Sequence, residues 1–368
     1  MIKPLNILVV AQTPPPVHGQ AIMTQYLLDG EYEKIKLHHV RMAFSDSIEE
    51  VGAFRWKKIL HLLGTILWVA YSRILTGSRV LYYPPAGPKK NAFYRDVAIL
   101  IATRWMFHKT VFHFYAAGVA DLYGELPWWG KILYRAAYGR ADSGLALFQE
   151  GLRDPEFLGC AKSVVIPCGC PDLPPADLGL EDPRTEPVVL FLAMLSDSKG
   201  VFVFLDACAE LVRRGIALRP VLVGWAESAA FERELEARVE ELNLKGILER
   251  HGKTVGEEKY AIYRRASVFC FPTFYPSEGS PVVLLEAMQF GLPIVATDWR
   301  GCSDIVVDGE TGFLVPIKNT AAVAEKLETL LKDHRLLKKM GRAGRERYQR
   351  LFTVEAFRCL MEKVLASV

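Results

Sequence analysis

The chain has 368 residues, of which 51% are hydrophobic and 24% are charged, and its formal net charge is +3 at pH 7. The length predicts about two domains, and the composition excludes collagen and low-complexity disorder. The longest uncharged apolar run, residues 59–72, is shorter than the roughly 20 residues that a membrane-spanning helix needs.

In the first half of the chain, short apolar runs alternate with longer helical segments. The pattern predicts strands at 7–10, 80–83 and 110–114, with helices starting near 21 and covering 56–75 and 92–107. Short strands that alternate with helices predict a parallel sheet covered on both faces.

A proline-rich segment, residues 167–187, follows and is interpreted as an interdomain linker. After it the alternation restarts. The second half has predicted strands at 188–193, 219–223, 268–271, 294–296 and 312–314, and predicted helices at 201–214, 229–242, 281–290 and 321–333. Two α/β halves joined by a hinge predict a cleft, lined by the carboxyl ends of the strands, as the ligand site.

The segment 271–288 is the most informative part of the chain. Its predicted strand ends at Pro272, a turn-rich loop carries Glu278, and a helix that begins near Pro281 carries Glu286. A helix N-terminus offers free N–H groups, and two carboxylates so placed can accept hydrogen bonds from vicinal hydroxyls. Glu286 stands among apolar residues, where an unpaired acid is costly, which favours a functional role over that of a solvated helix residue.

Glu278 and Glu286 are eight positions apart and form the E-x7-E signature of retaining glycosyltransferases, and the segment resembles glycosyltransferase family 4. Residues 252–253, 291–297 and 308–315 also resemble that family, and the resemblance is dense over about 190–316.

The resemblance implies an α/β fold of the GT-B type, with two Rossmann-like doubly wound domains facing across a cleft and a C-terminal helix that crosses back to the first domain. We expect an acceptor-binding domain over 1–170, completed by the C-terminal helix 353–368, and a nucleotide-sugar-binding domain over 187–350.

The same resemblance assigns donor-binding roles in the second domain. Glu286 is expected to bind the ribose hydroxyls, and Glu278, with the backbone of Gly279 and Ser280, to contact the donor sugar. Lys199 matches the lysine that holds the donor diphosphate, where its charge and a helix dipole act on the same phosphates.

One position departs from the family pattern. Met194 stands where the family often has an arginine that also binds the diphosphate. Arg300, beside Gly301, is a candidate replacement.

Two features of the first domain are also candidates. In the segment 14–21, Gly19 resembles the glycine whose backbone approaches the donor, although His18 replaces the usual preceding glycine. His113 matches a family histidine that meets the sugar and is a candidate catalytic residue together with Glu278 and Lys199. The register leaves Tyr115 as the alternative to His113, since side chains two apart on a strand point the same way.

Cleavage of a sugar–diphosphate bond leaves negative charge on the phosphate, which a fixed lysine and helix dipoles stabilise. No D-x-D pair occurs in the sequence. The missing motif predicts an enzyme that is metal-independent. The resemblance implies a retaining hexosyltransferase that needs no cofactor besides its donor, a UDP- or GDP-sugar. For this family, retention is explained by attack on the same face of the sugar, so no carboxylate is assigned as nucleophile.

The charge is concentrated in residues 51–140, which hold 13 basic and 3 acidic residues and five of the seven tryptophans. Such a window predicts docking on an anionic membrane and a lipid-linked glycan acceptor. The alternative is that these helices cover the sheet and expose ordinary lysines. Nucleic acid is not expected as a partner, because no recognition fold accompanies the charge. With seven scattered cysteines and no signal peptide, the protein is expected to be cytoplasmic and peripheral on the membrane.

The leading hypothesis is therefore a glycosyltransferase of bacterial polysaccharide biosynthesis. Two alternatives remain open at this point: a GT-B sugar-nucleotide epimerase, and a catalytically silent subunit that binds sugar nucleotides.

Overall fold

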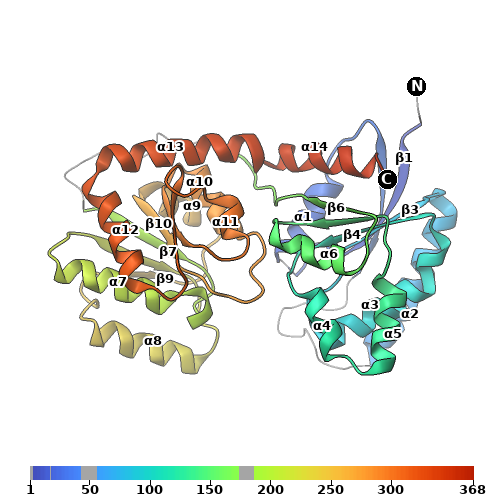
Figure 1. The fold of residues 1–368 in the computed structure, drawn as a ribbon, viewed down its shortest axis with the longest axis horizontal. Helices are drawn as coiled ribbons and strands as arrows, with labels where there is room; N and C mark the ends of the chain where they lie inside the picture. The colour runs from blue at the N-terminus through green and yellow to red at the C-terminus, as the bar shows by residue number, and fades with distance from the viewer. Residues whose placement is uncertain (1–2, 17, 43–55, 174–185) are drawn as a thin grey trace. The chain divides into compact units, whose positions relative to one another are not determined.

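The computed structural model describes residues 3–16, 18–42, 56–173 and 186–368, without the side chains of 56–59. The chain divides into two compact units (Figure 1). The first comprises Met1–Gly169 with Val354–Val368, and the second Cys170–Thr353. The division falls inside the segment that the sequence predicts to be a linker, of which residues 174–185 lie outside the described part.

Residues 170–172, which follow this division directly, are bound to a helix near the end of the second unit. Tyr348 donates from its hydroxyl to the carbonyls of Cys170 and Pro171 at 2.8 and 3.0 Å. Arg345 forms an ion pair with Asp172 at 2.6 Å. Residues 170–172, which the prediction assigned to the linker, are therefore attached to a helix of the second unit.

The first unit is built on a six-stranded parallel sheet with the order β2-β1-β3-β4-β5-β6. Its strands are β1 (Leu5–Ala11), β2 (Ile35–Arg41), β3 (Val80–Tyr83), β4 (Lys109–Phe114), β5 (Ser143–Ala146) and β6 (Lys162–Val165). Side chains alternate between the two faces along β1, since Leu8 and Val10 belong to one core and Ile7 and Val9 to the other. Both cores are buried, which is why the strand is apolar along its length.

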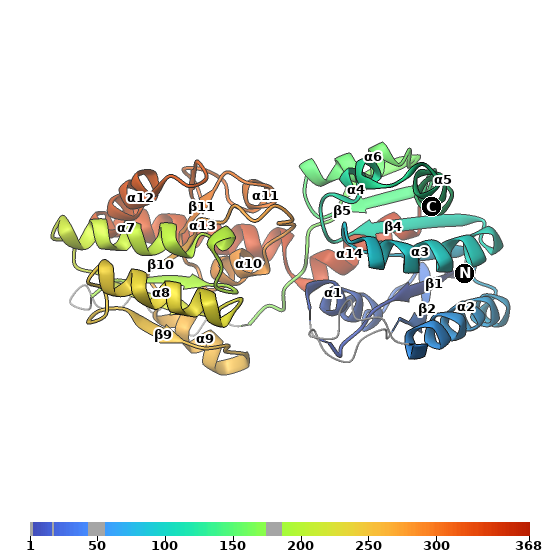
Figure 2. The same cartoon turned by 90° about the horizontal axis from the view of Figure 1, so that it is seen from below.

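Helices of the first unit supply the partners of both cores. They are α1 (Gly19–Leu28), α2 (Trp56–Thr76), α3 (Lys90–Thr103), η1 (Arg104–Met106), α4 (Val119–Glu125), α5 (Trp128–Tyr138), η2 (Glu150–Leu152), α6 (Arg153–Phe157) and, from the end of the chain, α14 (Val354–Leu365). Side chains of α2, α3 and α5 pack on one face of the sheet, where the three helices lie in a row (Figure 2). No helix in the described part of the chain is both long and apolar enough to cross a bilayer.

The C-terminal helix α14 belongs to the first unit, as expected. Phe357 and Met361 are buried in the same core as Leu27 of α1. Arg358 Nε also donates to the carbonyl of Tyr26 at 2.8 Å. The helix thus closes the sheet face opposite to α2, α3 and α5.

The second unit has its own six-stranded parallel sheet, with the order β12-β11-β10-β7-β8-β9. Its strands are β7 (Val188–Leu192), β8 (Arg219–Val223), β9 (Glu249–His251), β10 (Val268–Phe271), β11 (Ile294–Thr297) and β12 (Gly312–Val315). Counted from β7, this is the 3-2-1-4-5-6 order of the Rossmann fold, and it reverses between β7 and β10.

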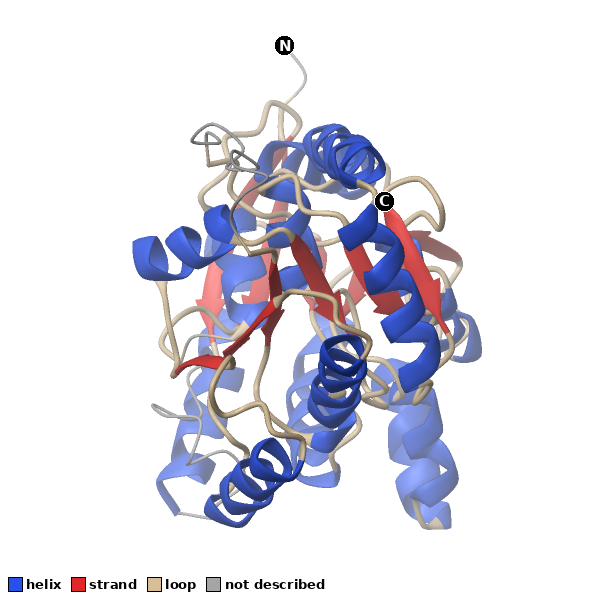
Figure 3. Cartoon of the chain, turned by 90° about the vertical axis from the view of Figure 1, so that its left-hand side faces the viewer, coloured by secondary structure: helices blue, strands red, loops and turns tan. Residues whose placement is uncertain are grey.

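Helices cover both faces of the second sheet (Figure 3). They are η3 (Asp197–Lys199), α7 (Val201–Arg213), α8 (Ala229–Glu241), α9 (Gly256–Arg265), α10 (Val282–Gln289), α11 (Cys302–Ile305), α12 (Thr320–Lys332) and α13 (His334–Leu351).

Candidate functional site

The candidate site lies where the strand order of the second sheet reverses. In open α/β sheets, ligands bind outside the carboxyl ends of the two strands that flank such a point. Lys199 follows β7, and the loop with Glu278 follows β10. The topology therefore brings these two predicted residues together from positions 79 residues apart.

Lys199 and Glu278 are in direct contact. Lys199 Nζ lies 2.7 Å from Glu278 Oε2, and the side chains are 16% and 8% exposed. Thr273 donates from its hydroxyl to the same carboxylate oxygen at 3.0 Å. The lysine ammonium also lies 4.5 Å from the ring centroid of Tyr275, within cation–π range. A fixed cation is thus enclosed by the loop that follows β10.

Gly200 makes this approach of the two loops feasible. Its φ is +83°, in the left-handed region that favours glycine. A Cβ at this position would lie 2.1 Å from the carbonyl oxygen of Pro272. The backbone after Lys199 can therefore meet the start of the β10 loop only without a side chain, and Phe274 N donates to the Ser198 carbonyl at 2.8 Å across this junction.

Glu286 is buried on α10 and faces α9. Lys259 Nζ lies 2.5 Å from its Oε1, and the Tyr263 hydroxyl donates to its Oε2 at 3.0 Å. Tyr263 is fully buried, and this burial, with the nearby carboxylate, raises the pKa of its hydroxyl. Sequence reasoning missed both partners. Their spacing of four residues indicates a shared helix face, but nothing in the sequence shows that this face meets Glu286.

The loop between the two glutamates ends in Gly279 and Ser280, which are both half-buried. The Ser280 hydroxyl oxygen is buried and has no hydrogen-bond partner within the described residues. Since an unpaired buried hydroxyl is costly, it is available to a ligand at the amino end of α10.

Arg300 is the candidate for the role of the arginine that the family often has at the position of Met194, and it lies on the loop after β11. Its guanidinium carbon lies 5.3 Å from the ring centroid of Trp299. Trp299 donates from Nε1 to the Tyr275 carbonyl at 2.9 Å, which attaches this loop to the loop of Glu278. Trp299 also lines a pocket of about 610 Å³ beside the carboxyl ends of β11 and β12. Met194 is half-buried.

In the first unit, His113 is fully buried near the end of β4. Its Nδ1 lies 2.7 Å from the Tyr82 hydroxyl, and its ring centroid lies 4.2 Å from that of Tyr115. Burial lowers the pKa of His113 to about 3, so the ring is neutral near pH 7. Its Nε2 has no hydrogen-bond partner among the residues that the structure describes. A role of His113 or Tyr115 at the sugar stays a prediction.

Gly19 is the exposed first residue of α1. A Cβ added there would meet no atom of the described residues within 4 Å, so nothing in that part of the chain requires glycine. His18 precedes it and accepts a hydrogen bond from the Ala21 amide at 3.4 Å, as an N-cap. A donor-binding role of Gly19 stays a prediction, and Val17 of the same loop lies outside the described residues.

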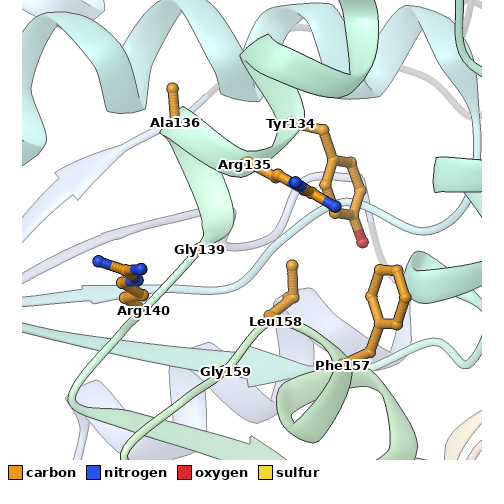
Figure 4. A pocket seen from close by; sticks show the side chains of 8 residues that line it. All are labelled: Tyr134, Arg135, Ala136, Gly139, Arg140, Phe157, Leu158 and Gly159. Carbon is orange, nitrogen blue, oxygen red and sulfur yellow. The ribbon is translucent and has the colours of Figure 1, made fainter. Parts of the chain in front are cut away.

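A further pocket, of about 590 Å³, lies at the amino ends of β5 and β6 (Figure 4). Its lining includes Tyr134, Arg135 and Phe157, and Arg140 lies apart from them beyond Gly139. None of the predicted site residues lines it. Within the described residues, no three His, Cys, Asp or Glu side chains are grouped as metal ligands.

Comparison with known proteins gives the fold of the chain and the proteins to which its second unit is similar in sequence. Residues 179–347 match the family model "Glycosyl transferases group 1". The putative colanic acid biosynthesis glycosyltransferase WcaL of Salmonella typhimurium is 30% identical over 185 residues, which cover 49% of this chain and 45% of the relative.

A second relative is GalNAc-α-(1→4)-GalNAc-α-(1→3)-diNAcBac-PP-undecaprenol α-1,4-N-acetyl-D-galactosaminyltransferase of Campylobacter jejuni. It is 29% identical over 192 residues, which cover 52% of this chain and 50% of the relative. The match to these relatives spans about half their length.

Among solved structures, Anabaena HepE in complex with UDP superimposes with a TM-score of 0.76. It is 17% identical, and the match covers 99% of this chain and 100% of HepE. The chain therefore has the GT-B fold, with two Rossmann-like parallel-sheet units, and its second unit is related in sequence to group 1 glycosyl transferases of bacterial polysaccharide biosynthesis.

Proposed function

We propose that this chain is a retaining glycosyltransferase that transfers a hexosyl group from a nucleotide-diphosphate sugar to a lipid-linked glycan in bacterial polysaccharide biosynthesis. The observation that carries the proposal is the contact of Lys199 with Glu278 at the point where the strand order reverses. A cation at this point can bind the diphosphate of a donor, and a carboxylate beside it can accept hydrogen bonds from the sugar of the same donor.

In the proposed reaction, Lys199 stabilises the leaving diphosphate. Negative charge develops on the phosphate oxygen as the sugar bond breaks, and a cation held in place beforehand stabilises that charge without reorganisation. Glu278 accepts hydrogen bonds from sugar hydroxyls, and Ser280 and the amides at the start of α10 supply donors. That HepE binds UDP supports a uridine nucleotide as the first donor to test.

Retention and metal independence are also part of the proposal. The acceptor attacks from the face that the diphosphate leaves, and the leaving phosphate takes the proton of the acceptor hydroxyl. Lys199 and backbone amides then supply the charge stabilisation that a divalent ion supplies in other enzymes. The absence of D-x-D from the sequence supports this mechanism.

A lipid-linked acceptor is proposed from the surface of the first unit. Of 20 large apolar side chains that are exposed in the described part of the chain, 13 lie on α2, α3, η1 and α5. We call these 13 the apolar helix face: Leu60, Leu63, Leu67, Trp68, Tyr71, Ile74, Leu75, Tyr94, Ile101, Trp105, Trp128, Trp129 and Ile132.

The apolar helix face suits an acidic bilayer surface. Seven of its members form a stripe along α2 at helical spacing, while Val69 on the opposite side of that helix is buried in the core. Exposed basic residues, among them Lys89, Lys90 and Arg135, lie on or beside the same helices. Each basic residue near an acidic leaflet contributes about 1 kcal/mol. Arg55 and the side chains of residues 56–58, which the prediction also included, lie outside the described part.

A donor-turnover assay tests the proposed activity. The purified chain is incubated with UDP- and GDP-sugars, with and without a lipid-linked acceptor, in EDTA. We expect an acceptor-dependent product with retained anomeric configuration. Interconversion of one sugar nucleotide into another would support the epimerase instead. Binding of a sugar nucleotide without turnover would support the silent subunit. If turnover is lost in EDTA and a divalent ion restores it, metal independence is contradicted, but the proposed sugar transfer is not. The relatives named above are transferases, which supports transfer.

A further inference from the structure

Glu286 carries one hydrogen-bond donor on each of its carboxylate oxygens. Lys259 Nζ binds Oε1 at 2.5 Å, and the Tyr263 hydroxyl binds Oε2 at 3.0 Å. A carboxylate offers about four lone-pair directions, two on each oxygen. Each oxygen of Glu286 therefore keeps about one acceptor direction that these two side chains do not use.

We propose that Lys259 is a positioning residue that holds the Glu286 carboxylate and orients it, so that its two oxygens accept hydrogen bonds from two neighbouring hydroxyls. This inference rests on the proposed function, in which those hydroxyls are the 2′ and 3′ hydroxyls of the donor's ribose. A single hydroxyl uses only one of the two open directions. The arrangement thus selects a ribonucleoside diphosphate over its 2′-deoxy counterpart.

Burial explains why Glu286 needs a cation. The residue is 8% exposed, and its neighbours on α10, Leu285 and Ala287, are fully buried. An ionised carboxylate in such surroundings is costly unless it is paired and hydrogen-bonded. Lys259, whose side chain is 19% exposed, supplies the positive charge from α9.

The two partners on α9 are themselves held in place. The ring of Tyr263 stacks on that of Phe290, with centroids 5.3 Å apart and planes at 8°. The Lys259 ammonium lies 5.5 Å from the ring centroid of Tyr260. Because Lys259 and Tyr263 are one helical turn apart, both bind the Glu286 carboxylate from one face of α9. The direction of the Glu286 oxygens is therefore set by contacts within the protein.

The chain offers a matched control for the lost charge. Lys245 pairs with Glu240 at 2.8 Å, but these side chains are 78% and 64% exposed. Pairs of that kind contribute little to stability. Lys245→Met removes the same charge from a solvated pair on the same unit.

The test measures ligand affinity by calorimetry for the full chain and for Lys259→Met, Lys259→Arg and Lys245→Met. The probes are UDP, GDP, ADP and CDP, the 2′-deoxy counterpart of the tightest binder, and inorganic diphosphate. Melting temperatures show which variants fold, and Lys259→Gln replaces Lys259→Met if the latter does not.

We expect the wild type to bind the ribonucleotide about tenfold or more tightly than its 2′-deoxy counterpart, because the deoxy compound lacks one hydrogen bond to a charged group. Lys259→Met should weaken ribonucleotide binding by about tenfold and bring the ribo-to-deoxy ratio close to one. Affinity for inorganic diphosphate should stay within about twofold, since Lys259 acts on the ribose side. Lys259→Arg should retain most of the preference, and Lys245→Met all of it.

An unchanged ribo-to-deoxy ratio in Lys259→Met, with or without a lower melting temperature, would overturn the inference and leave Lys259 as a link between α9 and α10. If no nucleoside diphosphate binds the folded wild type, the proposed function fails, and the inference fails with it. The two failures are distinguished by whether the wild type binds.

Discussion

Lys199 Nζ lies 2.7 Å from Glu278 Oε2. The two charges neutralise each other, so in the proposed function a donor diphosphate competes with Glu278 for the ammonium. The same contact keeps the cation in the place where the proposed reaction needs it.

Lys199→Met is expected to lower kcat/KM for sugar transfer by about 10²-fold or more, because it removes the fixed cation that stabilises the leaving diphosphate in the proposed reaction. Steady-state kinetics with the donor found by screening provide the measurement. Lys318→Met is the control, because Lys318 is an exposed cation whose ammonium lies 4.5 Å from the ring of Phe274, a residue of the loop that carries Glu278. Equal activity of the two variants would contradict the role of Lys199.

Gly200→Ala is expected to destabilise the second unit more than Gly215→Ala does. Both glycines have positive φ, +83° and +76°, so both variants carry a backbone cost of about 1–2 kcal/mol. At Gly200 the new Cβ would also meet the Pro272 carbonyl, whereas at Gly215 it would meet nothing within 4 Å among the residues that the structure describes. We expect a further loss of about 1–3 kcal/mol in urea-unfolding free energy at Gly200. Equal losses would show that the two loops separate freely.

The neutral state of His113 predicts a pH dependence of stability. In the unfolded chain the ring binds a proton below about pH 6.5, but in the folded chain its pKa is about 3. The unfolded state therefore binds more protons between these values, and the free energy of unfolding falls as pH is lowered through that window. The fall is at most about 1.4 kcal/mol per pH unit.

His113→Phe removes this contribution but keeps a ring beside Tyr115. Urea unfolding between pH 4 and pH 7 should show a shallower pH dependence for the variant than for the wild type. The pKa values of His18, His38 and His39 are also lowered by burial, so the wild-type slope has several sources and the difference between the two proteins is the readout. Parallel curves would mean that the folded protein protonates His113 readily.

The apolar helix face predicts binding to lipid vesicles. Leu67 and Ile74 on α2 are 70% and 74% exposed. The double variant Leu67→Glu, Ile74→Glu should lose about tenfold or more in partitioning, because burial of each apolar side chain contributes about 1.5–3 kcal/mol. Flotation on anionic vesicles at low salt provides the measurement.

The control for flotation is the double variant Val212→Glu, Leu360→Glu, which adds the same charge at exposed sites on α7 and α14. It should float like the wild type. If the wild type is not enriched on anionic over neutral vesicles, the chain does not dock on an acidic membrane through this face.

Several elements could be predicted from the sequence because their signal is local. The strands at 80–83, 219–223 and 268–271 are predicted at the observed bounds, since β-branched and aromatic runs between turn residues mark buried parallel strands. The edge strands β2, β6 and β9 were not predicted. They carry charged and polar residues such as Lys36, Lys162 and Arg250, and a half-solvated edge strand lacks a continuous apolar run.

The sequence alone determined the chemistry of the candidate site: a lysine before α7, and two acids eight positions apart with a serine at the amino end of α10. The acids and the serine are identified by residue type and spacing along one loop and its helix, and the lysine by its place before the other helix. Only the tertiary structure decided their partners, because the reversal of strand order joins loops distant in the chain and the packing of α9 on α10 brings Lys259 to Glu286. Hydrogen-bond partners across a fold depend on which helix faces meet, and that is a property of the packed core rather than of any short segment.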